Sequence, residues 1–206
     1  PMRALYLRMP AVATLVLAVG AGYLIGGIRS ALVVAALTLF IALSPWWDRA
    51  LVTLYMATFG VIVSCLIGFT VGTLCFQNKK SAAFMLGVCD IFQTFPSFVY
   101  LIPVMMLFGI TDTSVLIAVI VYATIPATRY TIEGLRSVPV GLHEAATMSG
   151  VNKFQRLTKI EFPLAFPHMM LGLNQTIVFA LFMVIIGAFI GTEDLGQYIL
   201  KALSDK

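Results

Sequence analysis

Charged residues are scarce in this 206-residue chain: Asp, Glu, Lys and Arg make up 11% of it, and hydrophobic residues make up 60%. Ordinary soluble domains contain about 25% charged residues. A water-soluble fold could not cover this much apolar surface, so the composition predicts an integral membrane protein. The net charge of +4 does not indicate nucleic-acid binding, because the basic residues flank the apolar runs instead of forming one patch.

Residues that carry chemistry are also few. The three cysteines lie inside apolar runs without a C-x2-C pairing, which excludes a disulfide framework and favours a role as small packing residues. His143 and His168 do not form a metal-binding set, and Ser64 and Ser97 have no evident base partner. We therefore expect neither catalytic nor metal-binding residues.

The phosphate-binding pattern G-x4-G-K-[ST] is missing as well. A process that used ATP would need another subunit to bind ATP and Mg²⁺. We expect no cofactor in this chain.

Long apolar runs are what the sequence has instead. A helix needs about 20 apolar residues to cross a bilayer. The runs predict an all-α, polytopic membrane protein in which residues 1–206 form one domain with about six spans. The expected spans are residues 10–28, 30–46, 50–76, 82–108, 113–128 and 168–191, followed by an amphipathic tail at 194–206.

Two details refine these spans. Pro96 and Pro103 each remove a helix hydrogen bond, so they predict a kink in the fourth span. Three pairs of glycines at i, i+4 spacing permit close helix contacts, either within one subunit or at a dimer face. These pairs are Gly22/Gly26, Gly68/Gly72 and Gly187/Gly191.

The distribution of Lys and Arg favours one orientation. With the polar segment 129–167 in the cytoplasm, the N-terminus lies outside, and more basic residues lie inside than outside. The inside set is Arg29, Lys79, Lys80, Arg129, Arg136, Lys153, Arg156 and Lys159; the outside set is Arg3, Arg8, Arg49, Lys201 and Lys206.

Segment 129–167 carries clear helix signals. Pro139 suits the first turn of a helix over 139–149, and Gly150 suits its end. Asn152 and Gln155 have capping-box spacing for a second helix, which we expect Pro163 to end. The sequence predicts a helix, a tight glycine turn and a helix.

This shape fits a surface that docks on a partner. Ala145 and Ala146 are small enough for close approach, Glu144 offers one charge, and Phe154, Leu157 and Ile160 form a possible anchoring stripe. The alternative is a solvated cytoplasmic hairpin without a partner.

The spacing E-A-A-x3-G-x9-I-x2-P resembles the EAA loop of ABC-importer permeases, which docks on the ATPase. Residues that carry this resemblance are Glu144, Ala145, Ala146, Gly150, Ile160 and Pro163. Phe162 stands where the family usually has leucine. We expect segment 129–167 to be the cytoplasmic coupling loop.

Two further stretches resemble permeases of the glycine betaine/proline betaine family. One is D-x2-Q-T-x-P-x-F-V-Y-L-x-P from Asp90 to Pro103, and the other is G-L-N-Q-T from Gly172 to Thr176. A similar stretch, I-G-x3-L-G, begins at Ile190. The resemblance covers about residues 50–200.

The resemblance implies a MetI-like permease in the inner membrane of a bacterium, which imports a methylated-amine osmolyte such as glycine betaine or choline and is not itself an enzyme. It also implies a second permease copy in a homodimer, two cytoplasmic ATPase subunits and an extracytoplasmic substrate-binding protein. Relatives usually continue into another span, and residue 1 is not methionine, so we expect the native protein to extend beyond both ends.

Polar residues within the spans are candidates for the substrate pathway. Asp90 either contacts substrate or pairs with Lys79, Lys80 or Arg129. The amides of Gln93, Asn174 and Gln175 either line the pathway or bond between helices, and Tyr100 and Tyr122 either face a quaternary ammonium group or pack.

Other functions fit the composition but not the motifs. An ion-coupled secondary transporter should show inverted repeats, and an intramembrane enzyme should show a convergent catalytic set. An osmotically gated channel would conduct without ATP. We carry the transporter and the channel as alternatives.

Overall fold

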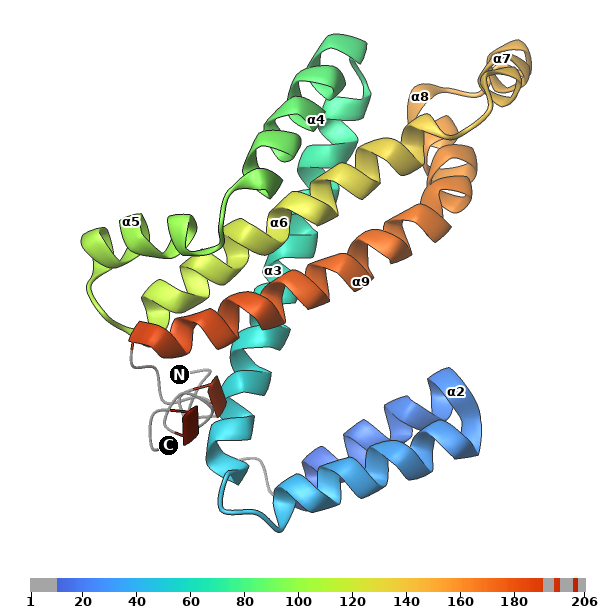
Figure 1. The fold of residues 1–206 in the computed structure, drawn as a ribbon. Helices are drawn as coiled ribbons and strands as arrows, with labels where there is room; N and C mark the ends of the chain where they lie inside the picture. Colours follow the sequence, from blue (N-terminus) through green and yellow to red (C-terminus); the bar gives the residue numbers. More distant parts are fainter. Residues whose placement is uncertain (1–10, 191–194, 197–201, 204–206) are drawn as a thin grey trace. The chain divides into compact units, whose positions relative to one another are not determined.

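The computed structural model describes residues 11–190, 195–196 and 202–203, and within these residues the chain is helical and contains no strand (Figure 1). Most of the expected tail 194–206, together with Gly191, Arg3, Arg8, Lys201 and Lys206, lies outside the described residues. The chain divides into two compact units. One comprises Pro1–Met56 with Ala188–Lys206, and the other comprises Ala57–Gly187.

In the first unit, helix α2 (Ala11–Ala42) is interrupted at Gly26 and Gly27. Gly27 has φ 68°, a left-handed conformation that glycine adopts without steric cost. A Cβ atom placed on Gly22 would lie 3.1 Å from Cγ2 of Val34, so the chain doubles back at the break. The expected spans 10–28 and 30–46 correspond to the two arms of α2.

Four helical segments of the described chain are long and apolar enough to cross a membrane, or five if one bent pair counts as a span. The expectation of about six spans is therefore approximate, because it counted the arms of α2 separately. The four segments are Val12–Ala42, Trp47–Phe76, Asp112–Arg136 and Lys153–Gly187.

The bent pair consists of α4 (Lys79–Thr94) and α5 (Phe98–Phe108), which meet at 90°. Pro96 lies in the break between them, so the predicted kink is confirmed there. Pro103 lies inside α5 without ending it. The break turns one apolar run into two short helices (Figure 1).

Close contacts between helices form the core of the second unit. On α3 (Trp47–Phe76), an added Cβ at Gly68 would lie 2.4 Å from Cβ of Ala127, and one at Gly72 would lie 2.7 Å from Cβ of Thr131. Both partners belong to α6 (Asp112–Arg136), which also packs along α9 (Phe162–Gly187). The pair Gly68/Gly72 therefore serves packing within the subunit.

Three predicted boundaries are wrong. The last span, expected to begin at residue 168, begins as α9 at Phe162. The span expected at 113–128 continues as α6 to Arg136. Pro163 does not end the second loop helix: α8 (Lys153–Arg156), the π-helical turn η1 (Leu157–Glu161) and α9 follow one another directly. A proline inside a helix removes one backbone hydrogen bond, and its ring clashes with the carbonyl one turn earlier. The wider π turn makes room for the ring and lets the neighbouring backbone groups find other partners.

Candidate functional site

Helix α7 (Val140–Met148) carries the E-A-A residues, and the segment from Pro139 to Glu161 is called the loop hairpin here. Glu144 and Ala145 are exposed, whereas Ala146 is only 5% exposed. The small side chain of Ala146 thus serves packing inside the hairpin, while Glu144 and Ala145 face outward.

The turn of the loop hairpin follows its local sequence. Gly150 has φ 72° and lies in open space, so this glycine is needed for its backbone conformation and not for room. The backbone N–H of Gln155 donates to Oδ1 of Asn152 at 2.8 Å. The backbone N–H of Asn152 donates to Oε1 of Gln155 at 3.2 Å. The predicted capping box is confirmed.

A groove of about 570 Å³ runs between α7 and the start of α9. Four of the six residues expected in the coupling site line it: Ala145, Ala146, Ile160 and Pro163. Glu144 lines an adjacent cavity of about 400 Å³ on the same helix. In this groove the structure thus brings together expected coupling residues that are up to 18 positions apart in the sequence.

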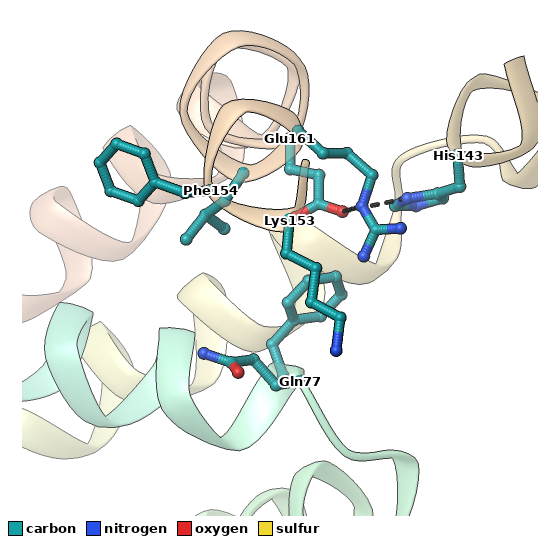
Figure 2. A pocket seen from close by; sticks show the side chains of 8 residues that line it. Gln77, His143, Lys153, Phe154 and Glu161 are labelled. Atoms are coloured by element: carbon teal, nitrogen blue, oxygen red, sulfur yellow. Dashed lines mark hydrogen bonds and ion pairs between the residues drawn. The ribbon is translucent and has the colours of Figure 1, made fainter. Parts of the chain in front are cut away.

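A buried carboxylate, not expected from the sequence, links the two sides of the loop hairpin. The side chain of Glu161 is only 3% exposed, and its Oε1 accepts from Nε of Arg156 at 2.9 Å. Nδ1 of His143 on α7 lies 3.0 Å from the same oxygen. Figure 2 shows Glu161 and His143 facing each other from different segments. We call these three residues the Glu161 clamp.

The position of Glu161 explains its burial. Its neighbours one turn before and after, Leu157 and Ala165, pack in the apolar cluster formed with Leu135 and Met169. An acid on such a face needs charged or hydrogen-bonding partners. The signal in the sequence is an acid that lies four residues from an apolar position on each side.

A second polar cluster lies on α4 and α6. Nη1 of Arg129 pairs with Oδ1 of Asp90 and donates to Oε1 of Gln93 at 2.8 Å, and Nε donates to Oε1 of Glu133 at 2.9 Å. The structure therefore joins Asp90 and Gln93 through Arg129, one of the partners expected for Asp90. We call these four residues the Arg129 cluster.

The remaining pathway candidates are not joined to this cluster by a described contact. Tyr100 is buried, its hydroxyl donates to the backbone oxygen of Phe92, and its ring lies 5.0 Å from that of Tyr122. Tyr122 stacks on Phe179 of α9 at 4.7 Å. Asn174 is exposed and Gln175 is half-buried on α9. In the described part of the chain, no group of His, Cys, Asp or Glu could hold a metal ion.

Comparison with known proteins identifies the family to which the chain belongs. The chain matches the family described as "Binding-protein-dependent transport system inner membrane component" over residues 60–206, and it belongs to this family. The predicted family and the MetI-like permease fold are confirmed. Membership also confirms that the chain is a multi-pass inner-membrane transport component and not an enzyme.

Individual relatives cover the whole chain. The "Trimethylamine N-oxide transport system permease protein TmoV" of Pelagibacter ubique is 90% identical over 206 residues, which are 100% of this chain and 29% of the relative. The protein of the same name from Ruegeria pomeroyi is 46% identical over 204 residues, 99% of this chain and 31% of the relative.

A more distant relative carries another substrate in its name. The "Glycine betaine/proline betaine transport system permease protein ProW" of Escherichia coli is 33% identical over 199 residues, 97% of this chain and 56% of the relative. The chain spans less than a third of the length of the two trimethylamine N-oxide permeases and about half of this one.

Proposed function

We propose that the chain is the membrane-spanning part of an ATP-driven importer for trimethylamine N-oxide. The observation that carries this proposal is the 90% identity, over every residue of the chain, with a permease named for that substrate. Identity falls to 33% with the permease named for glycine betaine and proline betaine. The importer would include a substrate-binding protein, which the description of the family as a binding-protein-dependent transport system supports, and two ATPase subunits, which the resemblance to ABC-importer permeases implies.

In this proposal the loop hairpin is the coupling site for the ATPase. Glu144 and Ala145 face outward, and Ala145, Ala146, Ile160 and Pro163 line one groove into which a partner side chain can fit. Gly150 fixes the turn that presents them. ATP binding would close the ATPases, displace the hairpin and reorient the spans, and hydrolysis would reset them.

The Arg129 cluster supports a pathway on one face of the subunit. The side chain of Asp90 is 60% exposed, and an acid that faced lipid there would be costly. This face therefore meets water or protein in the membrane, as expected if two copies of the permease enclose a pathway. Asp90 and Gln93 would line it, joined by Asn174 and Gln175, with Tyr100 bracing the bend between α4 and α5.

Glycine betaine and related methylated amines are the second candidate substrates, because relatives named for them share the same region of the chain. The ion-coupled transporter and the osmotically gated channel are disfavoured by the family, whose description names a binding-protein-dependent system.

Uptake into liposomes tests the substrate. The full-length protein that contains this chain is reconstituted with its ATPase and binding protein, and labelled trimethylamine N-oxide is supplied outside with ATP inside. We expect ATP-dependent uptake that unlabelled trimethylamine N-oxide suppresses at lower concentration than glycine betaine, choline or carnitine. Uptake that persists without ATP would favour the channel or the ion-coupled transporter.

Glu144→Lys tests the coupling site. We expect the variant to insert into the membrane at normal levels while uptake falls about tenfold or more, because a charge facing the ATPase is reversed. The measurement compares uptake and ATP hydrolysis in the same liposomes. Normal uptake per ATP hydrolysed would remove Glu144 from the coupling site.

Gly150→Asp tests the turn, with Gly141→Ala as the matched control. Both glycines lie in open space, but only Gly150 has a positive φ. We expect Gly150→Asp to lose uptake at normal membrane levels, because the replacement strains the turn by about 1 kcal/mol. Gly141→Ala should transport normally. Equal uptake by both variants would contradict the role of the turn.

A further inference from the structure

Helix α7 needs a tertiary attachment to keep its place. It has nine residues, and isolated helices shorter than about 12–15 residues are marginal in water. Among the described contacts, Ala146 packs inward, its backbone oxygen accepts from the amide of Val151 at 3.1 Å, and His143 reaches Glu161. Only the last of these joins α7 through two polar side chains to the segment that becomes α9.

A cavity makes this contact more important. The space beside the Glu161 clamp measures about 420 Å³ and is lined by Phe76, Gln77, Lys153 and Phe154 as well as the clamp (Figure 2). Apolar packing therefore does not fill this side of the loop hairpin. The contact between His143 and Glu161 is what holds α7 against it.

Glu161 stands where a displacement can be passed on. It is the last residue of η1, and α9 follows without a break to Gly187. Arg156 fixes the carboxylate from the preceding helix α8, and His143 approaches the same oxygen from α7. A movement of α7 thus reaches a long membrane helix through one buried oxygen atom.

From this geometry we propose that Glu161 is a positioning residue that makes α7 and α9 move as one body, so that a displacement of α7 by the ATPase reorients the membrane span. The inference rests on the proposed coupling function of the loop hairpin. Glu144 and Ala145 face outward and would contact the ATPase, whereas Glu161 would pass the resulting movement from α7 to α9.

The first test measures the attachment itself and needs neither substrate nor ATPase. Spin labels are placed at Val140→Cys on α7 and Phe166→Cys on α9, both exposed, in full-length protein in which the native cysteines are alanine. We expect one narrow distance distribution in the parent. His143→Ala should broaden it, and His143→Gln, whose amide can still donate to Glu161, should restore most of it.

His143→Ala is the sharper variant because it leaves the pair between Arg156 and Glu161 intact, so the rest of the hairpin keeps its charge balance. Glu161→Gln provides a second test, since it removes the charge but keeps an acceptor. Gly141→Ala on the same helix is the control and should keep the narrow distribution. Distributions in His143→Ala and Glu161→Gln that match the parent would overturn the proposal.

The second test measures transmission in the reconstituted importer. We expect His143→Ala to lower the substrate taken up per ATP hydrolysed about tenfold, within the range usual for coupling between two sites. A residue needed only for folding would lower assembled complex, hydrolysis and uptake together and leave this ratio unchanged, and that result would contradict the proposal. If the parent importer takes up no trimethylamine N-oxide, the substrate proposal fails, and the spin-label distances alone decide the role of Glu161.

Discussion

The Glu161 clamp and the Arg129 cluster use the same chemistry in different surroundings. Each pairs an arginine with a carboxylate, and the arginine side chains are similarly exposed, 32% for Arg156 and 29% for Arg129. The acids differ: Glu161 is 3% exposed and Asp90 is 60% exposed. A buried carboxylate depends on its partners, whereas an exposed one keeps part of its hydration. This difference suits Glu161 to holding two segments together and leaves Asp90 accessible to other molecules or subunits.

Arg156→Ala should have the largest effect on stability. It removes the arginine of the clamp and leaves the buried acid with His143 alone, which should lower the free energy of unfolding by about 3–5 kcal/mol. Arg136→Ala is the control, because Arg136 is exposed and bonds only a backbone oxygen among the described contacts. Unfolding of the full-length protein in detergent checks both. Equal losses in the two variants would mean that burial of the acid does not set the cost.

Arg129→Ala should have an intermediate effect. The change removes the hydrogen bonds to Asp90 and Gln93 that join α6 to α4, and one to Glu133 within α6, which should cost about 1–2 kcal/mol. The acids left behind, Asp90 and Glu133, are 60% and 38% exposed, against 3% for Glu161, so the loss should stay below that of Arg156→Ala. The same unfolding measurement checks the order, and a reversed order would contradict the contrast between the two pairs.

Asp90→Asn should have the smallest effect on stability, about 0.5 kcal/mol, because the side chain is mostly exposed and asparagine keeps an acceptor for Arg129. Its effect on transport should be larger than its effect on stability. If Asp90 braces α4 beside the pathway, uptake falls while membrane levels stay normal. Full expression with unchanged uptake would remove Asp90 from both the pathway and the brace.

Several local features were predictable because they depend on near neighbours in the sequence. The capping box of Asn152 and Gln155 formed as expected, and Pro96 lies in the break between α4 and α5. The close approach at Gly68 and Gly72 follows from small residues in an apolar run. Each of these features is determined by residues close together in the sequence, and tertiary packing does not change it.

Other features were missed because they depend on distant segments. The expected end of the second loop helix at Pro163 was wrong, since the π turn before it lets the helix continue into α9. The contact between His143 and Glu161 arises only when α7 folds back across the start of that helix. The choice among Lys79, Lys80 and Arg129 as the partner of Asp90 likewise required the packing of α4 on α6.

The sequence by itself determined that this protein is a helical membrane protein of a transport family, because apolar runs and motif spacings are set by the order of residues along the chain. Only the tertiary structure decided which carboxylate is buried. Burial depends on which face of a helix meets the core. Arg156 is a near neighbour of Glu161 in the sequence, but His143 becomes its second partner only after α7 and α9 are in place.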